Sequence, residues 1–433
     1  MMSYAESLGE TGRKRGRLWA YGACLSGCVS EVMLDVSAII ILYIQMLGGN
    51  DTVMMSVSSL TGLVNMFLFI PCVAIIARIG LKPSVRIACL TGTAGYLLMA
   101  FAPFFGTYRC HVVISGCFIY CLQRALYGAC WYPLLDAFLR PEDRGKFFGT
   151  LRFMYYSFTG VLFYLIGMAM GKNPPEWLMQ TVIGVTGLGL LVRNYCISRF
   201  PEDANAKHET PNIRKALRIS ICNGPLTAYS VYVCLLTIAN SSLGPVTYIY
   251  LREYVKLDPG MVQRISAVGM AGHILGFLLY SRLLKRFGIK KLELAVHISY
   301  LLAAFLMFAL DSRMPGYVFI VAAILGVITF TGSIFGCNNS GEMLALARPG
   351  NKTMAPAFVQ TYTSFGGFIG RGGVTLLLGA TLLEPVWQCC GMDISRYQTI
   401  FLFSGVIAAV VLLLIPTLPA VVPKHRDYYE PMR

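Results

Sequence analysis

The chain has 433 residues, of which 56% are hydrophobic and 13% are charged, whereas a soluble domain usually has about 25% charged residues. A chain with so few charges cannot cover itself with a solvated surface, so the composition excludes an ordinary soluble protein. The net charge of +15 would suit nucleic-acid binding only if the basic residues gathered on one soluble face, and they do not.

Apolar runs near the ~20 residues needed to cross a bilayer recur along the chain and predict an all-α integral membrane protein. Each run is continuously apolar instead of alternating, which indicates helices. The twelve predicted transmembrane helices lie at about 18–47, 52–76, 84–105, 111–139, 147–170, 177–197, 219–251, 261–284, 291–311, 316–346, 354–383 and 398–421.

The basic residues alternate between the gaps that separate these spans. The N-terminal tail, the even-numbered gaps and the C-terminal tail hold 27 of the 36 Lys and Arg residues, and the odd-numbered gaps with their edges hold seven. The remaining two, Arg124 and Arg371, lie inside spans. Basic loops face the cytoplasm, so both termini are predicted to be cytoplasmic in a multi-pass protein. The run after Arg13 is too long for a signal peptide and is taken as the first span.

The first span carries two acidic residues, Glu31 and Asp35, in the segment SEVMLDVS. A spacing of four places both on one helical face. Ionisable groups deep in a membrane are costly and usually functional. Two neighbouring carboxylates repel each other and favour the binding of a proton, so we predict a proton-coupling site, with sodium as the rival ion.

Arg124, near the middle of the fourth span, completes this predicted site. An Arg cannot lose its own proton, so it can bias only when a nearby carboxylate binds or releases one. The alternative interpretation is a static buried ion pair that orients two helices.

Uncharged polar residues in other spans are candidates for contact with a polar solute. Asn240 precedes Gly244-Pro245 in the seventh span, where proline permits a bend. The predicted substrate-binding residues are Tyr155, Asn240, Asn338, Gln360 and Arg371. For each uncharged member, the alternative role is hydrogen bonding between helices.

Arg371 lies near mid-depth in the eleventh span, within GGFIGRGG. It could bind an anionic substrate or pair with Glu31 or Asp35. Alternatively, it could hydrogen-bond backbone carbonyls or extend towards the outer face. The glycines here, and those of GMAGHILG at Gly269, predict close helix packing. His273, within that segment, is expected to be a packing partner instead of a ligand.

Short motifs recur half a chain apart. The basic turn Arg78–Lys82 returns at Arg286–Lys290, an offset of 286 − 78 = 208 residues, and Arg140-Pro141 returns as Arg348-Pro349 at the same offset. The repeat predicts two parallel six-helix halves, at 1–198 and 218–433, joined by a polar cytoplasmic linker at 199–217.

These features resemble the major facilitator superfamily of transporters. The two basic turns are similar to its loop signature, Gly-x-x-x-Asp-Arg-x-Gly-Arg-Lys, although Ala77 and Lys285 stand at the Asp position. RALYG, from Arg124 to Gly128, resembles an Arg-x-x-x-Gly signature in the fourth span of proton-driven members. The resemblance implies that the first and fourth spans line one central cavity, where Glu31 and Arg124 could meet.

The predicted function is a secondary active transporter, coupled to protons, that moves a sugar-like or other small polar solute across the inner membrane. The alternatives are a proton-driven exporter of amphipathic compounds and an uncoupled facilitator. No phosphate loop, HExxH motif or nucleophile elbow occurs, so no enzyme activity, cofactor or metal is expected. The expected partners are a small molecule, a proton or Na⁺ and the lipid bilayer, without nucleic acid, and the chain is expected to be a monomer.

Overall fold

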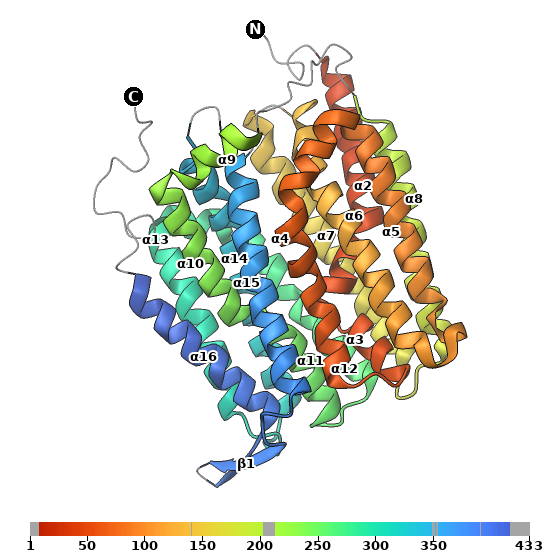
Figure 1. Cartoon of the computed structure of the whole chain (residues 1–433), viewed down its shortest axis with the longest axis vertical. Helices are drawn as coiled ribbons and strands as arrows, with labels where there is room; N and C mark the ends of the chain where they lie inside the picture. The colour runs from red at the N-terminus through yellow and green to blue at the C-terminus, as the bar shows by residue number, and fades with distance from the viewer. Residues whose placement is uncertain are drawn as a thin grey trace. The chain divides into compact units, whose positions relative to one another are not determined.

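The structure is a computed structural model that describes residues 8–139, 141–201, 213–348, 351, 354–389 and 391–415. Helices make up nearly all of this part of the chain (Figure 1). Eight of them are long and apolar enough to cross a membrane, and α2 with α3 forms one further, bent span. One of the eight, Pro259–Ala309, is 51 residues long and contains two consecutive spans. With the more polar α5 and α15, the described helices match the twelve predicted spans.

The first six predicted spans correspond to α2 (Glu10–Asp35) with α3 (Ile39–Met46), α4 (Asp51–Ile79), α5 (Leu81–Ala100), α6 (Arg109–Asp136), α7 (Pro141–Met170) and α8 (Glu176–Ser198). The 3₁₀ helix η1 (Ala102–Tyr108) precedes α6, and a short helix, α9 (Ile213–Ile221), begins inside the predicted linker and ends after it. The last six spans correspond to α10 (Gly224–Asn240) with α11 (Leu243–Glu253), α12 (Pro259–Gly269), the two parts of α13 (Ala271–Ala309), α14 (Tyr317–Ala345), α15 (Met354–Gly379) and α16 (Arg396–Leu414).

Both repeated basic turns depend on a glycine in the same unusual conformation. Gly80 has φ 89° and ψ 166° between α4 and α5, and Gly288 has φ 76° and ψ 162° inside α13. Only glycine adopts this region readily. The predicted tight glycine turn is therefore present in each half of the sequence.

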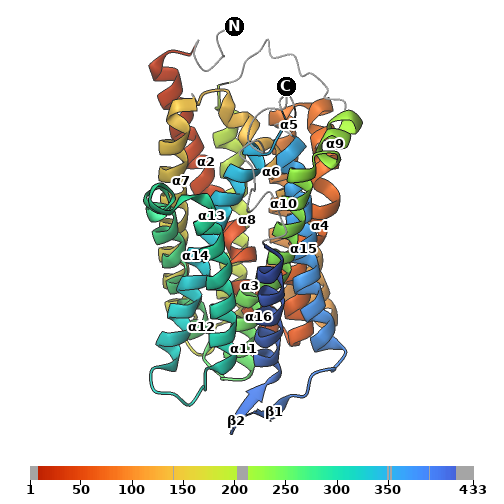
Figure 2. The ribbon, with the colours of Figure 1, turned by 90° about the vertical axis from the view of Figure 1, so that its left-hand side faces the viewer.

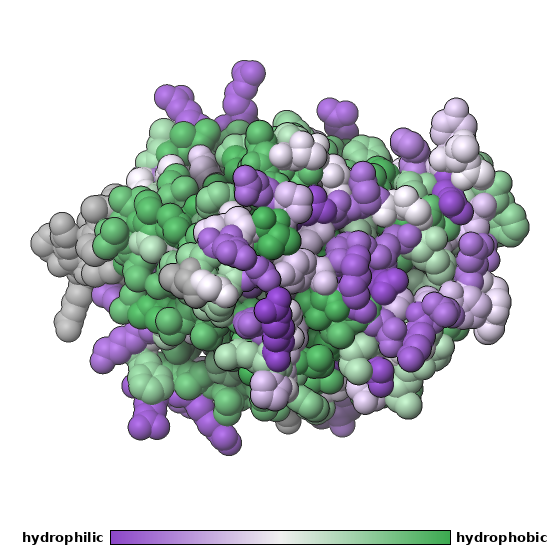
Figure 3. Space-filling model, turned by 90° about the horizontal axis from the view of Figure 1, so that it is seen from below, coloured by the Kyte–Doolittle hydropathy of each residue, from purple (hydrophilic) through white to green (hydrophobic). Residues whose placement is uncertain are grey.

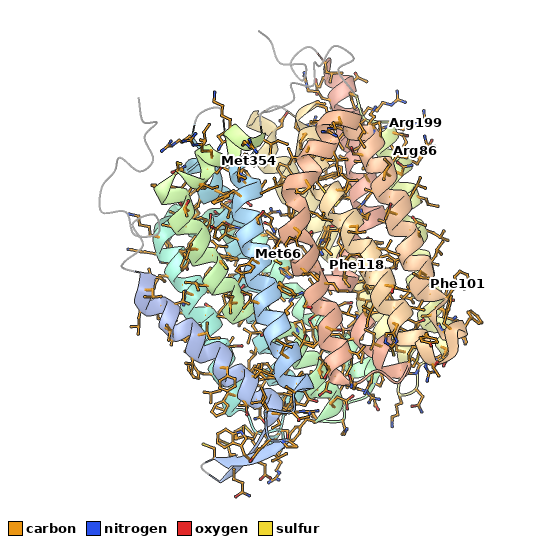
Figure 4. The ribbon with its side chains drawn as sticks, viewed as in Figure 1. Met66, Arg86, Phe101, Phe118, Arg199 and Met354 are labelled. Carbon is orange, nitrogen blue, oxygen red and sulfur yellow. The ribbon has the colours of Figure 1, made fainter. Side chains whose placement is uncertain are left out.

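The helices group into two compact units. Unit 1 comprises residues 1–35, 67–159 and 175–211. Within it α5 packs against α6 and α8, and α2 packs against α8 (Figure 1). Arg86 and Arg199 lie at one end of this unit, and Phe101 lies at the other (Figure 4). An added Cβ at Gly95 would lie 2.7 Å from the Gly116 carbonyl oxygen, so small residues allow α5 to approach α6 closely.

Unit 2 comprises residues 36–66, 160–174 and 212–433. In it α13 packs against α14 and α16, while α10 packs against α15 and α16 (Figures 1 and 2). Both glycine-rich segments lie at such contacts, which confirms the predicted close packing. An added Cβ at Gly272 would lie 2.0 Å from the Gly326 carbonyl oxygen, and one at Gly366 would lie 2.4 Å from that of Cys234. His273 Nδ1 lies 2.8 Å from Ser333 Oγ of α14, so this histidine is a packing partner, as expected.

The end of α15 leads into a hairpin that the sequence did not predict. Strands β1 (Val386–Cys389) and β2 (Met392–Ser395) pair antiparallel in the gap before α16. Figure 3 shows hydrophilic residues gathered over the end of the molecule that carries this hairpin. Large apolar side chains, among them Phe67, Val185 and Leu376, are exposed on the sides of the helices, as suits surfaces that contact lipid.

The predicted division of the chain at 199–217 stays a prediction, because most of that segment, 202–212, lies outside the described residues. The compact units do not follow it in every detail. Unit 2 includes α3, the beginning of α4 and the end of α7, all from the first half of the sequence.

Candidate functional site

Glu31, on α2, is held by two side chains within unit 1. Arg193 Nη1, on α8, donates to Glu31 Oε1 at 2.6 Å. The Tyr155 hydroxyl, on α7, donates to Glu31 Oε2 at 3.2 Å. The predicted contact between Glu31 and Arg124 is replaced by one with Arg193, because Arg124 is engaged by a different carboxylate. Tyr155 was predicted to contact the substrate, but its hydroxyl donates to Glu31 in this structure.

Asp35 is the last residue of α2, and it forms an ion pair with Arg124 of α6. The side chains are 21% and 28% exposed, respectively. The two acids on one face of α2 therefore have separate arginine partners from two helices. Their mutual repulsion is offset by these cations, so the expected shared proton site takes the form of two adjacent ion pairs.

Arg193 is the residue of this site that sequence reasoning missed. Its side chain is only 1% exposed. Its Nε donates to the Ala23 carbonyl at 3.1 Å, and its Cζ lies 4.3 Å from the centre of the Tyr127 ring. An added Cβ at Gly27 would lie 1.7 Å from Nε, so glycine makes room for the guanidinium.

On sequence alone Arg193 counts among the cytoplasmic basic residues, since it lies near the end of the predicted sixth span. The sequence contains only a weak indication that Arg193 faces the first span. Gly27 and Gly189 are small residues in the first and sixth spans, and an added Cβ at Gly189 would lie 2.5 Å from the Ser26 carbonyl oxygen. Such pairs mark close helix contact, and a basic residue four positions after Gly189 falls on the same face.

Tyrosines fix the position of α2 beside these pairs. The Tyr96 hydroxyl, on α5, donates to the Ser30 carbonyl at 2.6 Å. Ser30 Oγ lies 3.0 Å from the Tyr120 hydroxyl of α6. Because Ser30 precedes Glu31, these bonds orient the face of α2 that carries the carboxylates.

In unit 2 the guanidinium of Arg371 binds backbone carbonyls, which was one of the alternatives to its predicted contact with a substrate. Its Nε donates to the Ser241 carbonyl at 2.9 Å, and its Nη1 donates to the Ser58 carbonyl of α4 at 2.7 Å. Ser241 lies in the break between α10 and α11. Arg371 therefore stabilises an interrupted helix and joins it to α4.

Removing this guanidinium should destabilise the backbone at the break between α10 and α11. We expect Arg371→Gln to lower the free energy of unfolding by about 2 kcal/mol, because charged donors to two carbonyls are lost. Transport of neutral and anionic solutes should fall to the same extent, as measured in proteoliposomes. Arg371→Lys is the matched variant that keeps the charge but not the two-pronged geometry. A loss confined to anionic solutes would contradict the carbonyl-binding role.

The other predicted substrate residues of unit 2 differ in how they are engaged. Asn338 Nδ2 donates to Glu293 Oε2 at 3.0 Å. Asn240 Nδ2, at the end of α10, is buried and has no hydrogen-bond partner among the described residues. Gln360 is half-buried in α15 and lies eleven residues, or three turns, before Arg371, which places both on one face. The roles of Asn240 and Gln360 in binding a solute stay predictions.

Two polar clusters within unit 2 join segments from the two halves of the sequence. Gln45 of α3 donates through Nε2 to Glu253 and accepts at Oε1 from Arg252 Nε of α11, the latter at 2.6 Å. At the start of α4, Asp51 pairs with Arg396 and accepts from the Tyr397 hydroxyl at 2.8 Å. Neither cluster was predicted, because each depends on tertiary contacts far apart in sequence.

Charged pairs between apolar helices, together with the breaks between α2 and α3 and between α10 and α11, are features that membrane transporters share. A family model described as MFS/sugar transport protein matches residues 87–343, more than half of the chain. The chain therefore belongs to this family within the major facilitator superfamily. It is a secondary transporter of small solutes and not an enzyme.

Solved structures share the fold at low sequence identity. The nucleoside transporter NupG is 14% identical, with a TM-score of 0.67 over 95% of this chain and 99% of its own. The xylose transporter XylE from E. coli is 12% identical, with a TM-score of 0.68 over 94% and 98%. A POT family transporter in complex with 5-aminolevulinic acid is 12% identical, with a TM-score of 0.68 over 95% and 97%. No curated protein sequence matches this chain.

Proposed function

We propose that this protein couples proton movement to the transport of a small polar organic solute, sugar-like or another polar metabolite, across the cytoplasmic membrane by alternating access. Both termini would face the cytoplasm, as the alternation of basic loops indicates. The family description includes sugar transport, and one similar structure is a D-xylose-proton symporter. The amide groups of Asn240 and Gln360 are of the kind that bind a solute rich in hydroxyl groups.

The ion pair between Asp35 and Arg124 is the observation that carries the proposal of proton coupling. Protonating Glu31 would leave Arg193, which is almost fully buried, without a counter-charge, and such a loss is strongly destabilising. We expect protonating Asp35 to cost less, because the Arg124 side chain is 28% exposed, against 1% for that of Arg193. We therefore assign proton exchange to Asp35, and we assign to Glu31 the task of holding α2 against α8.

In this mechanism Asp35 acts at the junction where α2 ends and the first span bends. When it binds a proton, its attraction for Arg124 falls and the contact between α2 and α6 weakens. When the proton leaves, the pair re-forms. A change in contact between helices that depends on proton occupancy is the differential interaction that coupling requires.

The test is accumulation of a labelled solute by proteoliposomes under an imposed pH gradient. We would use xylose and uridine as probes, representing a sugar and a nucleoside. Asp35→Asn should abolish accumulation while retaining exchange of labelled for unlabelled solute, because exchange needs no net proton movement. Glu176→Gln, an exposed acid at the start of α8, is the matched control and should behave like wild type.

Four outcomes would contradict this proposal. Accumulation that survives Asp35→Asn would remove Asp35 from the coupling step. Solute equilibration that ignores the pH gradient in the wild-type protein would favour an uncoupled facilitator. Accumulation driven by a sodium gradient would replace the proton by sodium, and proton-driven extrusion of amphipathic dyes would favour an exporter.

A further inference from the structure

A carboxylic side chain that has no cationic partner among the described residues is buried in unit 2. Glu293 lies on α13, a few residues after Gly288, and is 3% exposed. Asn338, on α14, is 0% exposed. No Lys, Arg or His among the described residues forms an ion pair with Glu293. An isolated carboxylate is very costly in such a place, and a group in this situation usually becomes neutral.

Glu293 and Asn338 share one hydrogen bond, and a second one between them would need one more hydrogen atom. Asn338 Nδ2 donates to Glu293 Oε2 at 3.0 Å. The two remaining oxygens, Glu293 Oε1 and Asn338 Oδ1, are both buried and without a partner in the described part of the chain. Both are acceptors when Glu293 is ionised, so neither can satisfy the other. A proton on Oε1 converts it into a donor and lets a planar acid face a planar amide through two hydrogen bonds.

In the part of the chain that the structure describes, the titratable groups that interact with Glu293 are not cationic. Tyr232 of α10 and Tyr300 of α13 lie close enough to interact with its charge, and so does Glu342 of α14. Glu342 lies one turn after Asn338 on the same face of α14, and a second acid opposes ionisation of the first. His297 is engaged elsewhere, with Nε2 2.6 Å from the Ala408 carbonyl oxygen and Nδ1 3.5 Å from the Tyr232 hydroxyl.

We propose that Glu293 and Asn338 form a proton-binding site in unit 2, in which Glu293 carries the proton on Oε1 and donates it to Asn338 Oδ1. The site is separate from Asp35 and Glu31, which lie in unit 1, and it does not depend on the coupling role given to Asp35. It provides a second place where the transporter can take up a proton. Two rival arrangements would place a bridging water or a sodium ion between the same oxygens, with Glu293 ionised.

Infrared difference spectroscopy of the full-length protein in liposomes distinguishes these arrangements. The C=O stretching band of a protonated carboxylic acid should be present in the wild type near neutral pH and should shift in D₂O. Glu293→Gln should remove this band, whereas Glu342→Gln and Asp35→Asn should leave it in place. Asn338→Leu should move it to higher frequency, because the amide no longer binds the acid.

Glu293→Gln should also fold normally, since a neutral amide replaces a neutral acid of the same shape. Its melting temperature should therefore match that of the wild type. The absence of the acid band from the wild type would overturn the proposal and favour the bridging water. A band that disappears when sodium chloride replaces choline chloride would overturn it in favour of a sodium site. Because these readouts involve no solute, they are independent of the transport tests on Asp35.

Discussion

Glu31→Gln is expected to lower the free energy of unfolding by about 3 kcal/mol, at the lower end of the range for breaking a buried ion pair. Among the described residues, the substitution leaves the guanidinium of Arg193 in contact with the Ala23 carbonyl and the Tyr127 ring but without a counter-charge. The lower end applies because Glu31 itself is 22% exposed. Denaturant unfolding in detergent micelles measures this loss.

Two further variants separate the ion pair from other effects of removing an acid. Glu10→Gln breaks an exposed pair with Lys14 and should change the stability by a few tenths of a kcal/mol at most. Combining Glu31→Gln with Arg193→Met should recover stability relative to Glu31→Gln alone, because the unpaired charge is gone. Equal losses in Glu31→Gln and Glu10→Gln would contradict the structural role of the Glu31–Arg193 pair.

Gly272→Ala is expected to destabilise the contact between α13 and α14 by about 3 kcal/mol, the upper part of the usual range for overpacking. The added Cβ would lie 2.0 Å from the Gly326 carbonyl oxygen and 2.2 Å from Thr329 Oγ1. Backbone atoms cannot rotate away as a flexible side chain can, so the two helices must separate. Thermal unfolding of the purified protein gives the measurement.

Gly326→Ala is the matched control for this substitution. It lies in α14 at the same contact, but an added Cβ there would have no atom within 4 Å. Alanine favours a helix over glycine by up to about 1 kcal/mol, so this variant should be as stable as the wild type or more so. Similar losses in Gly272→Ala and Gly326→Ala would show that close packing at Gly272 is not what stabilises the pair.

Features that depend on one helix at a time could be predicted from the sequence. Length and hydropathy identified the spans, and the recurrence of Arg78–Lys82 at Arg286–Lys290 located two turns that both need glycine. The glycine-rich segments indicated close packing because small residues on one face of a helix let a neighbouring backbone approach closely. These predictions need no knowledge of how the helices are rotated.

Features that depend on the rotation of one helix against another could not be predicted. Glu31 and Asp35 were correctly placed on one face of α2, but depth alone suggested Arg124 as the partner of Glu31. The structure instead turns Arg193 of α8 towards Glu31 and leaves Arg124 for Asp35. Glu293 was overlooked because an acid near the end of a predicted span looks like a loop residue until its burial is known.

The pairing of Glu31 with Arg193 also constrains how the chain is made. The two residues are 162 positions apart, so at ~5–20 residues per second the ribosome reaches Arg193 roughly 10–30 s after Glu31. An arginine entering lipid alone costs about 2.5–3.5 kcal/mol at the insertion machinery. We therefore expect the first helix to wait beside the translocon until the sixth emerges, so that the two leave for the bilayer together.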